Sequence, residues 1–205
     1  MNKFAVMLVC LLVAGLSTGW CDEAKKKPVA LVAVGDVDDA IVKDVQSWAE
    51  ANLAVPVPLL EKQPAVKGLL DEQAREVAKL IGPDDLGLVA LVWPADEDVK
   101  NHGVIIKEDR VVVVNVRAMK EGAADDTQWT WRVERQALRG IAMLLDLQPC
   151  PDPFCTLTQY STIEDLDKVG RNFCPPCLLK IQERVTAGGI ELIPGNPYNM
   201  MGTGE

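Results

Sequence analysis

The sequence predicts an α/β domain with a mixed sheet and a helical C-terminal part. Short apolar runs alternate with segments of helical periodicity in the first half of the chain. Two apolar runs joined by a charged turn then predict a hairpin, and the last third combines helical segments with four closely spaced cysteines. Alternating strands and helices are typical of a parallel sheet, to which a hairpin adds an antiparallel strand.

Residues 1–21 have the layout of a secretory signal peptide. A lysine precedes an uninterrupted apolar run over residues 4–16, and small residues follow, so cleavage is expected after Gly19 or Cys21. The run is shorter than the roughly 20 residues of a membrane span, although a retained anchor is the alternative. Lipid modification of Cys21 is a third reading, against which the bulky Trp20 argues. The protein is therefore expected to be exported, to a periplasm or the extracellular space, with a lipoprotein as the variant form.

The bulk properties bound the partners and the number of domains. The chain has 205 residues, a net charge of −9 and no basic block. Nucleic acid and anionic membrane surfaces would repel it, so neither is an expected partner. Without the signal peptide the chain is long enough for one domain with its own core, expected over residues 28–186. The remainder, residues 187–205, is rich in glycine, proline and methionine and is expected to be a flexible tail.

The first half of the domain predicts strands and helices in alternation. Residues 28–34 form a continuous apolar run, as expected of a buried parallel strand. A helix should follow from an N-cap at Asp38. Residues 54–60 (AVPVPLL) predict a short second strand, which its prolines place at the sheet edge or a strand end. Residues 68–81 predict another helix, and residues 86–94 (LGLVALVWP) predict a third strand.

The second half predicts a hairpin and then helices. Residues 102–116 (HGVIIKEDRVVVVNV) read as two strands joined by the charged KEDR turn. A long helix is expected over residues 129–147. Further on, Ser161 and Glu164 have the spacing of a capping box. The PPCLLKIQERV segment predicts a last short helix, with prolines in its first turn.

Four of the six cysteines form two close pairs. Cys150 and Cys155 make the first pair, Cys174 and Cys177 make the second, and prolines flank both. Two such pairs can converge on one tetrahedral zinc ion, which is structural because four cysteines leave no open coordination position. In an oxidising compartment Cys150–Cys155 and Cys174–Cys177 disulfides would be stable instead. Both readings stay open from the sequence.

The stretch from residue 132 to residue 177 resembles the archaemetzincins, a family of zinc metallopeptidases among the metzincins. In that family a helix carries a HExxHxxGxxHC motif, whose cysteine begins a Cys-x4-Cys…Cys-x-x-Cys zinc site. With Cys150 as the anchor, the residues that match the surroundings of the motif are Arg132, Val133, Arg135, Ala137 and Leu147. The segments EDLDKVGRNFCPPC, VALVAVGDVDD, GPDDLGLVALV and HGVIIKEDRVVVVNVRAM are similar to the family more loosely. The resemblance implies a metzincin-like mixed, twisted sheet with helices, an antiparallel edge hairpin and a helical C-terminal part around a four-cysteine knuckle.

The catalytic positions of the family carry other residues in this register. The three histidine ligands fall on Arg139, Met143 and Pro149, the general-base glutamate on Gly140, and the motif glycine on Asp146. The methionine expected below the metal would fall near residues 156–157, which are threonine and leucine. Arginine is a permanent cation, a thioether is a poor ligand for zinc, and proline has no donor atom.

The argument also holds without any register. The whole chain contains one histidine, His102, so a site with three histidines is impossible. His102 itself is interpreted as a loop residue before a strand. Glu134, Arg139 and Asp146 could form an acid–base set, but a solvated or paired helix surface explains them better. One structural zinc ion and no catalytic zinc ion are therefore expected.

The favoured interpretation is an exported, proteolytically inactive archaemetzincin-like protein. The resemblance implies that a peptide or protein partner would lie extended along the edge strand within residues 103–116, since strand addition needs no catalytic metal. Arg139 could attract a carboxylate of such a partner. One alternative is an active zinc-dependent metallopeptidase with unorthodox ligands, such as Glu134 or Asp146. The other is a purely structural envelope protein, whose former cleft is closed by Met143 and its neighbours.

Overall fold

The computed structural model describes residues 29–190 and 192–193. The expected signal peptide, with Cys10 and Cys21, lies outside the described residues, and so does most of the expected tail. The few tail residues that are described contact the domain: Ile190 is buried, and the amide of Ile193 donates to the carbonyl of Ala54 at 2.6 Å. Within the described ranges, no helix is long and apolar enough to cross a membrane.

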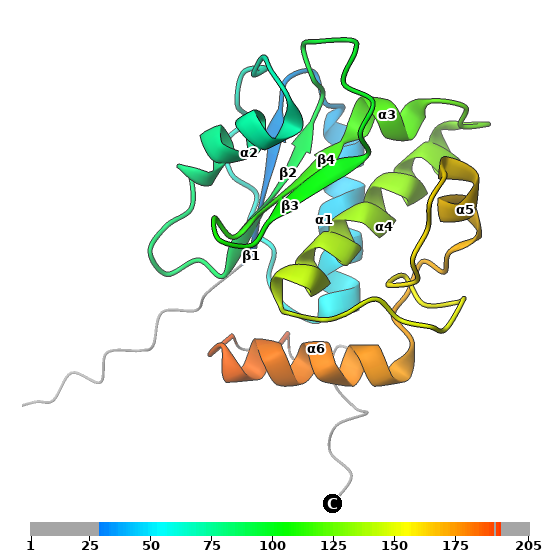
Figure 1. Ribbon diagram of the computed structural model, residues 1–205. Helices are drawn as coiled ribbons and strands as arrows, with labels where there is room; N and C mark the ends of the chain where they lie inside the picture. Colours follow the sequence, from blue (N-terminus) through cyan, green and yellow to red (C-terminus); the bar gives the residue numbers. More distant parts are fainter. Residues whose placement is uncertain (1–28, 191, 194–205) are drawn as a thin grey trace, which may run out of the picture.

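A four-stranded mixed sheet lies at the centre of the domain (Figure 1). Its strands are β1 (Val29–Val34), β2 (Gly87–Val92), β3 (Gly103–Ile106) and β4 (Val111–Asn115). The order across the sheet is β1-β2-β4-β3. β1, β2 and β4 run parallel, and β3 pairs antiparallel with β4. The predicted α/β fold, with a mixed sheet and an antiparallel edge hairpin, is confirmed.

Helices cover both faces of this sheet. The helices are α1 (Asp39–Leu53), α2 (Leu70–Ala78), α3 (Val116–Lys120), α4 (Asp126–Leu144), α5 (Ile163–Lys168) and α6 (Pro175–Ala187). In Figure 1, α1 and α4 lie on one side of the sheet and α2 on the other, while α6 runs across the lower ends of α1 and α4.

The alternating side chains of the strands divide the core into two clusters. Leu31, Leu91 and Val112 pack with the layer of α1, α4 and α6, whereas Val32 and Ala90 pack with α2. Every residue of β1, β2 and β4 is buried, because helices cover both of their faces. The residues of β3 are exposed or half-buried, as expected of an edge strand.

The two edges of the sheet differ. At the β1 edge, Leu59 and Gln63 form isolated bridges with β1. The strand predicted over residues 54–60 is therefore wrong: this segment follows the edge irregularly, because Pro56 and Pro58 cannot donate to a ladder. At the β3 edge, no backbone hydrogen bond arrives from another element within the part of the chain that the structure describes. One edge is covered, and the other is open.

The long helix predicted over residues 129–147 is α4, displaced toward the N-terminus. It begins earlier because the carboxylate of Asp125 accepts a hydrogen bond from the amide of Gln128 at 2.8 Å and caps the helix there. It ends earlier because Asp146 adopts a left-handed φ of 62°. A left-handed residue just after a helix is a common way for the helix to end.

Two predicted caps have different outcomes. Asp38 caps α1 as predicted, and its carboxylate accepts from the amide of Ala40 at 2.8 Å. The capping box on Ser161 is wrong, because the N-cap of α5 is Thr162, whose hydroxyl accepts from the amide of Asp165 at 3.2 Å.

Helix α3 was not predicted, because its first residue continues the apolar run of β4. The carboxamide of Asn115 ends the strand and caps this short helix by accepting from the amide of Ala118 at 3.0 Å. The turn directs the chain toward the start of α4, which crosses the sheet and presents the residues of the candidate site.

Candidate functional site

The four cysteines of the two pairs meet in one cluster. Their sulfur atoms all lie within 4.8 Å of one another, and the Cys150 and Cys174 sulfurs are 3.7 Å apart. The corners of a zinc–sulfur tetrahedron with bonds of about 2.3 Å are about 3.8 Å apart, whereas a disulfide bond is about 2.05 Å long. All four cysteines are free thiols here. The cluster fits one tetrahedral ion and favours it over the two disulfides.

Short turns and a helix start bring the four sulfurs together. The Cys150 amide donates to the Leu157 carbonyl at 3.1 Å, and the Cys155 amide donates to the Asp152 carbonyl at 3.0 Å. Cys174 is the N-cap of α6, and prolines occupy the first positions of that helix. The Cys174 amide also donates to the Cys155 sulfur at 3.4 Å. Such N–H···S contacts hold a thiolate in place for a metal ion.

Burial makes these thiols hard to ionise without a cation. It raises the pKa of Cys155 to about 11, and it raises the pKa of Cys177 as well, with further contributions from the neighbouring thiols. A zinc ion binds the thiolate form, so binding would release protons and offset the burial. The chemistry of the donor set and its spacing therefore fit zinc.

Arg139 stands at the first histidine position of the family motif and is buried. Its side chain is 8% exposed. Its Nη1 atom donates to the Thr156 carbonyl at 3.0 Å and to the Thr158 carbonyl, and its guanidinium lies 5.2 Å from the centre of the Tyr160 ring. The resemblance places the floor of a metal site at residues 156–157. A permanent cation thus contacts this floor.

Gly140, at the position of the general base, lies against the sheet. A β-carbon there would meet Cγ1 of Val112 at 2.3 Å. This position therefore has no room for a glutamate unless the helix moves away from the sheet.

Replacing Gly140 by alanine is expected to destabilise the protein, by about 1–3 kcal/mol, because the added methyl overpacks the contact with Val112. In an open helical position the same change would stabilise by about 0.5–1 kcal/mol. Thermal and denaturant unfolding measure the difference. The control is Gly140→Ala combined with Val112→Ala, which should cost less than the sum of the two single changes. A neutral or stabilising Gly140→Ala would contradict the close approach.

The other motif positions also lack catalytic groups. Asp146 is exposed and forms an ion pair with Lys107 at 3.0 Å. Its left-handed backbone is the conformation that favours glycine, which agrees with the motif glycine falling on this position. Met143 and Pro149 line cavities rather than a cluster of ligands. In the described residues, the four cysteines are the one group of three or more His, Cys, Asp or Glu close enough to share an ion.

A groove follows β3 beside α4. One cavity of about 420 Å³ lies between β3, β4, α4 and Tyr160, with Arg139 in its wall. A second cavity of about 380 Å³ extends from it toward Lys107 and Pro149. Ile105 and Met143 line both cavities, so the two adjoin. The cleft beside α4 is therefore open rather than filled.

His102 lies in the wall of the first cavity. It directly precedes β3, as predicted, and its ring stacks on the Tyr160 ring with the centroids 5.9 Å apart. The Tyr160 hydroxyl lies 3.5 Å from Nδ1 of His102. Burial lowers the pKa of His102, which favours the neutral imidazole. The sequence gave no indication that Tyr160 would be its neighbour.

The structure does not bring Glu134, Arg139 and Asp146 together. Glu134 is buried and accepts a charge-assisted hydrogen bond from Arg171 at 2.6 Å. Burial raises the pKa of Glu134 against the opposing effect of Arg171. The prediction of a solvated helix surface is wrong for Glu134 and Arg139, while the pairing of Glu134 is confirmed. The Arg171 guanidinium also lies 4.0 Å from the centre of the Trp48 ring.

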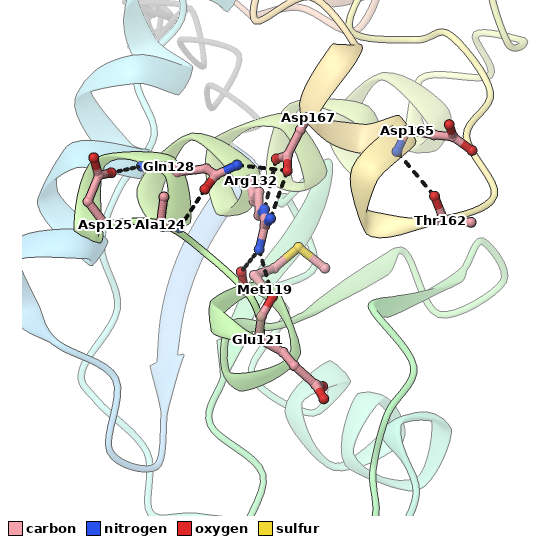
Figure 2. Close-up of polar contacts among 9 residues, drawn as sticks. All are labelled: Met119, Glu121, Ala124, Asp125, Gln128, Arg132, Thr162, Asp165 and Asp167. Atoms are coloured by element: carbon pink, nitrogen blue, oxygen red, sulfur yellow. Dashed lines mark hydrogen bonds and ion pairs between the residues drawn. The ribbon is translucent and has the colours of Figure 1, made fainter.

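Arg132 anchors the start of α4 (Figure 2). The side chain is 2% exposed. It donates to both carboxylate oxygens of Asp167, at 2.8 and 2.7 Å, and to the Met119 and Glu121 carbonyls at 3.0 and 2.8 Å. The hydrogen bond to Asp167 raises the pKa of Arg132. One buried cation thus joins α3, α4 and α5 and fixes the helix that carries the site. Sequence reasoning did not identify this role.

Fold and site together define a metzincin-like α/β domain with a four-cysteine cluster, and solved structures agree. The chain is similar to a zinc-dependent peptidase from Methanocorpusculum labreanum (strain Z), with 17% identity and a TM-score of 0.60 over 75% of this chain and 99% of that chain. It is similar to archaemetzincin from Methanopyrus kandleri, with 17% identity and a TM-score of 0.61 over 78% and 96%.

A third similar structure is archaemetzincin from Archaeoglobus fulgidus, solved in complex with malonate, with 15% identity and a TM-score of 0.58 over 74% and 98%. No family model and no curated protein matches the sequence. At these identities the likeness establishes the fold: the chain has an archaemetzincin-like fold.

Proposed function

We propose that this protein is an exported, proteolytically inactive archaemetzincin-like binding protein. One zinc ion on Cys150, Cys155, Cys174 and Cys177 stabilises the domain, and an extended peptide or protein segment is held along β3. The observation that carries the proposal is the substitution of the catalytic centre beside an open groove. The buried guanidinium of Arg139 contacts the carbonyls of the expected metal floor, while the groove along β3 remains accessible.

The loss of catalysis follows from the residues present. Zinc peptidases of this kind need three neutral ligands and an open position for water. Here a guanidinium occupies the first ligand position, and a dication beside it would be repelled. The candidate replacement ligands Glu134 and Asp146 are paired with Arg171 and Lys107. These contacts argue against the alternative of an active enzyme with unorthodox ligands.

The geometry of β3 supports strand addition. The Asn115 amide donates to the His102 carbonyl at 3.0 Å, and His102 is opposite Asn115 in the register of the hairpin. Hydrogen-bonded and non-hydrogen-bonded pairs alternate in an antiparallel ladder. The backbone N–H and C=O groups of Gly103 and Ile105 therefore point away from β4, toward the open edge. An extended segment placed there would pair with them.

The open groove also supports binding over a purely structural role. A structural relative would gain stability by filling the space beside α4, since buried voids reduce stability. Instead, cavities of about 420 and 380 Å³ adjoin along β3. Met143 lines both cavities without closing either.

We expect the purified mature protein to hydrolyse no peptide bond in a pool of fluorogenic peptides, with or without added zinc. The same protein should bind a pool of unstructured synthetic peptides. Ile105→Pro should weaken this binding by about tenfold or more, because it removes an outward N–H. The ladder to β4 does not use that N–H, so folding should be retained. Ile105→Ala, which keeps the N–H, is the matched control.

Two results would contradict the proposal. Peptide hydrolysis that a chelator abolishes, with two metal ions per chain, would show an active enzyme. Equal peptide binding by Ile105→Pro and Ile105→Ala would show that strand addition at β3 is not the mode of binding.

A further inference from the structure

Arg139 differs from the other buried arginines of α4 in its charge environment. Arg132 is paired with Asp167, and Arg135 lies close enough to Asp167 and Glu134 for their charges to raise its pKa. Arg139 has no carboxylate within ion-pair distance in the described residues. The groups that favour its charged form are Tyr160 and the Cys155 thiol, and the pKa values of both are raised. Without a bound ligand, this buried cation lacks an anionic partner.

Part of the guanidinium remains available for a ligand. The two N–H groups of Nη1 are directed to the Thr156 and Thr158 carbonyls. The donors on Nε and Nη2 have no hydrogen-bond partner among the residues that the structure describes. The side chain lines the cavity of about 420 Å³. The Nε and Nη2 donors form a planar fork that matches two carboxylate oxygens.

The rest of the cavity defines the ligand further. Arg139 is the one permanent cation in its wall, and the wall holds no carboxylate. One guanidinium balances a single negative charge, which favours a carboxylate over a phosphate dianion. Val104, Ile105 and Met143 supply apolar surface, and Gln136 adds one neutral polar group. The ligand chemistry is thus a carboxylate attached to a short apolar group.

We propose that the Arg139 cavity binds such a carboxylate, and that in a bound peptide it is the C-terminal carboxylate. The second half of this statement rests on the proposed peptide binding. The cavity begins at His102 and Gly103, where β3 starts, and the groove continues along the strand toward Lys107. A peptide paired with Gly103 and Ile105 would place one end beside Arg139. A terminal carboxylate there neutralises the buried cation.

The single histidine of the chain provides a direct measurement. His102 is the one histidine in the sequence, and its ring lies in the cavity wall, stacked on Tyr160. Its imidazole NMR signals therefore report on this cavity alone. Sodium propionate and propionamide are the first probes, because they have the same shape and differ in charge.

We expect propionate to shift the His102 signals in a saturable manner and propionamide to leave them unchanged. Arg139→Gln should abolish the effect of propionate. Lys107→Gln, which removes the cation at the other end of the groove, should preserve it. Because Arg139→Gln also loses the bonds to two carbonyls, the comparison of the two probes on the unaltered protein decides the result even if this variant does not fold.

Peptides then distinguish the source of the carboxylate. A pool of hexapeptides with free C-terminal carboxylates should bind about 10- to 100-fold more tightly than the same pool with C-terminal amides, the range for a charge-assisted hydrogen-bonded contact. Equal binding of the two pools, with a response to propionate, would overturn the terminal assignment and leave a side-chain or small-molecule carboxylate.

The remaining outcomes separate this inference from the proposed function. A propionate response without binding of either peptide pool would overturn the peptide function and support the carboxylate site. Binding of both pools with no propionate response, or with an equal response to propionamide, would overturn the carboxylate site and leave strand addition standing. The absence of every response would overturn both.

Discussion

Replacing Cys177 by serine is expected to remove the proposed zinc ion and to cause one of the largest losses of stability available in this chain. Cys177 is buried in the first turn of α6, and Cys155 is fully buried across the cluster. Structural zinc contributes about 10–16 kcal/mol of binding free energy in small zinc peptides. The core here is larger, so partial structure should persist, but we expect Tm to fall on the order of 10 °C or more.

Metal analysis and thermal unfolding, with and without a chelator, measure this effect. The unaltered protein should contain one zinc ion per chain, and a chelator should lower its Tm to about that of Cys177→Ser. The variant should contain no zinc, and the chelator should not change its Tm further. A protein without zinc, whose four cysteines are oxidised and whose Tm responds to a reductant instead, would establish the disulfides and contradict this prediction.

The second large effect is expected for Arg132→Met. The change keeps an apolar side chain of similar length but leaves the Asp167 carboxylate and the Met119 and Glu121 carbonyls without their donor. Breaking a buried pair by removing one partner costs about 3–5 kcal/mol. Because Asp167 is 22% exposed, we expect the lower part of that range, and a fall in Tm of about 6–12 °C.

Two further variants test the cause. Lys168→Met removes an exposed ion pair with Asp165 on the neighbouring α5 and should cost less than about 0.5 kcal/mol. Adding Asp167→Leu to Arg132→Met should restore part of the stability, since it removes the unpaired charge. If Arg132→Met proved as mild as Lys168→Met, the network of Figure 2 would not anchor α4.

Local signals in the sequence predicted much of the fold. The apolar runs of β1, β2 and β4 and the N-cap at Asp38 were recognised because each depends on residues a few positions apart. The strand expected over residues 54–60 failed, because its prolines prevent a ladder while still allowing the chain to follow β1. Helix α3 was missed because Val116 extends the strand pattern, and Asn115 ends the strand through a side-chain contact.

The candidate site was predictable in part. The convergence of the cysteines was expected from their spacing, since each pair is held within one tight turn. Gln136, Arg139 and Met143 lie three and four positions apart, which places them on one face of a helix, so their common cavity could have been inferred. The contribution of Tyr160 could not, because it reaches His102 from a distant segment of the chain.

The sequence by itself determined what this protein lacks. A chain with one histidine cannot supply three histidine ligands, and no fold can change that count. Only the tertiary structure decided what stands in their place: Arg139 bonded to Thr156 and Thr158, one edge of the sheet covered and the other open. The physical reason is that these contacts join distant segments, and their geometry depends on how the helices pack on the sheet rather than on any local periodicity.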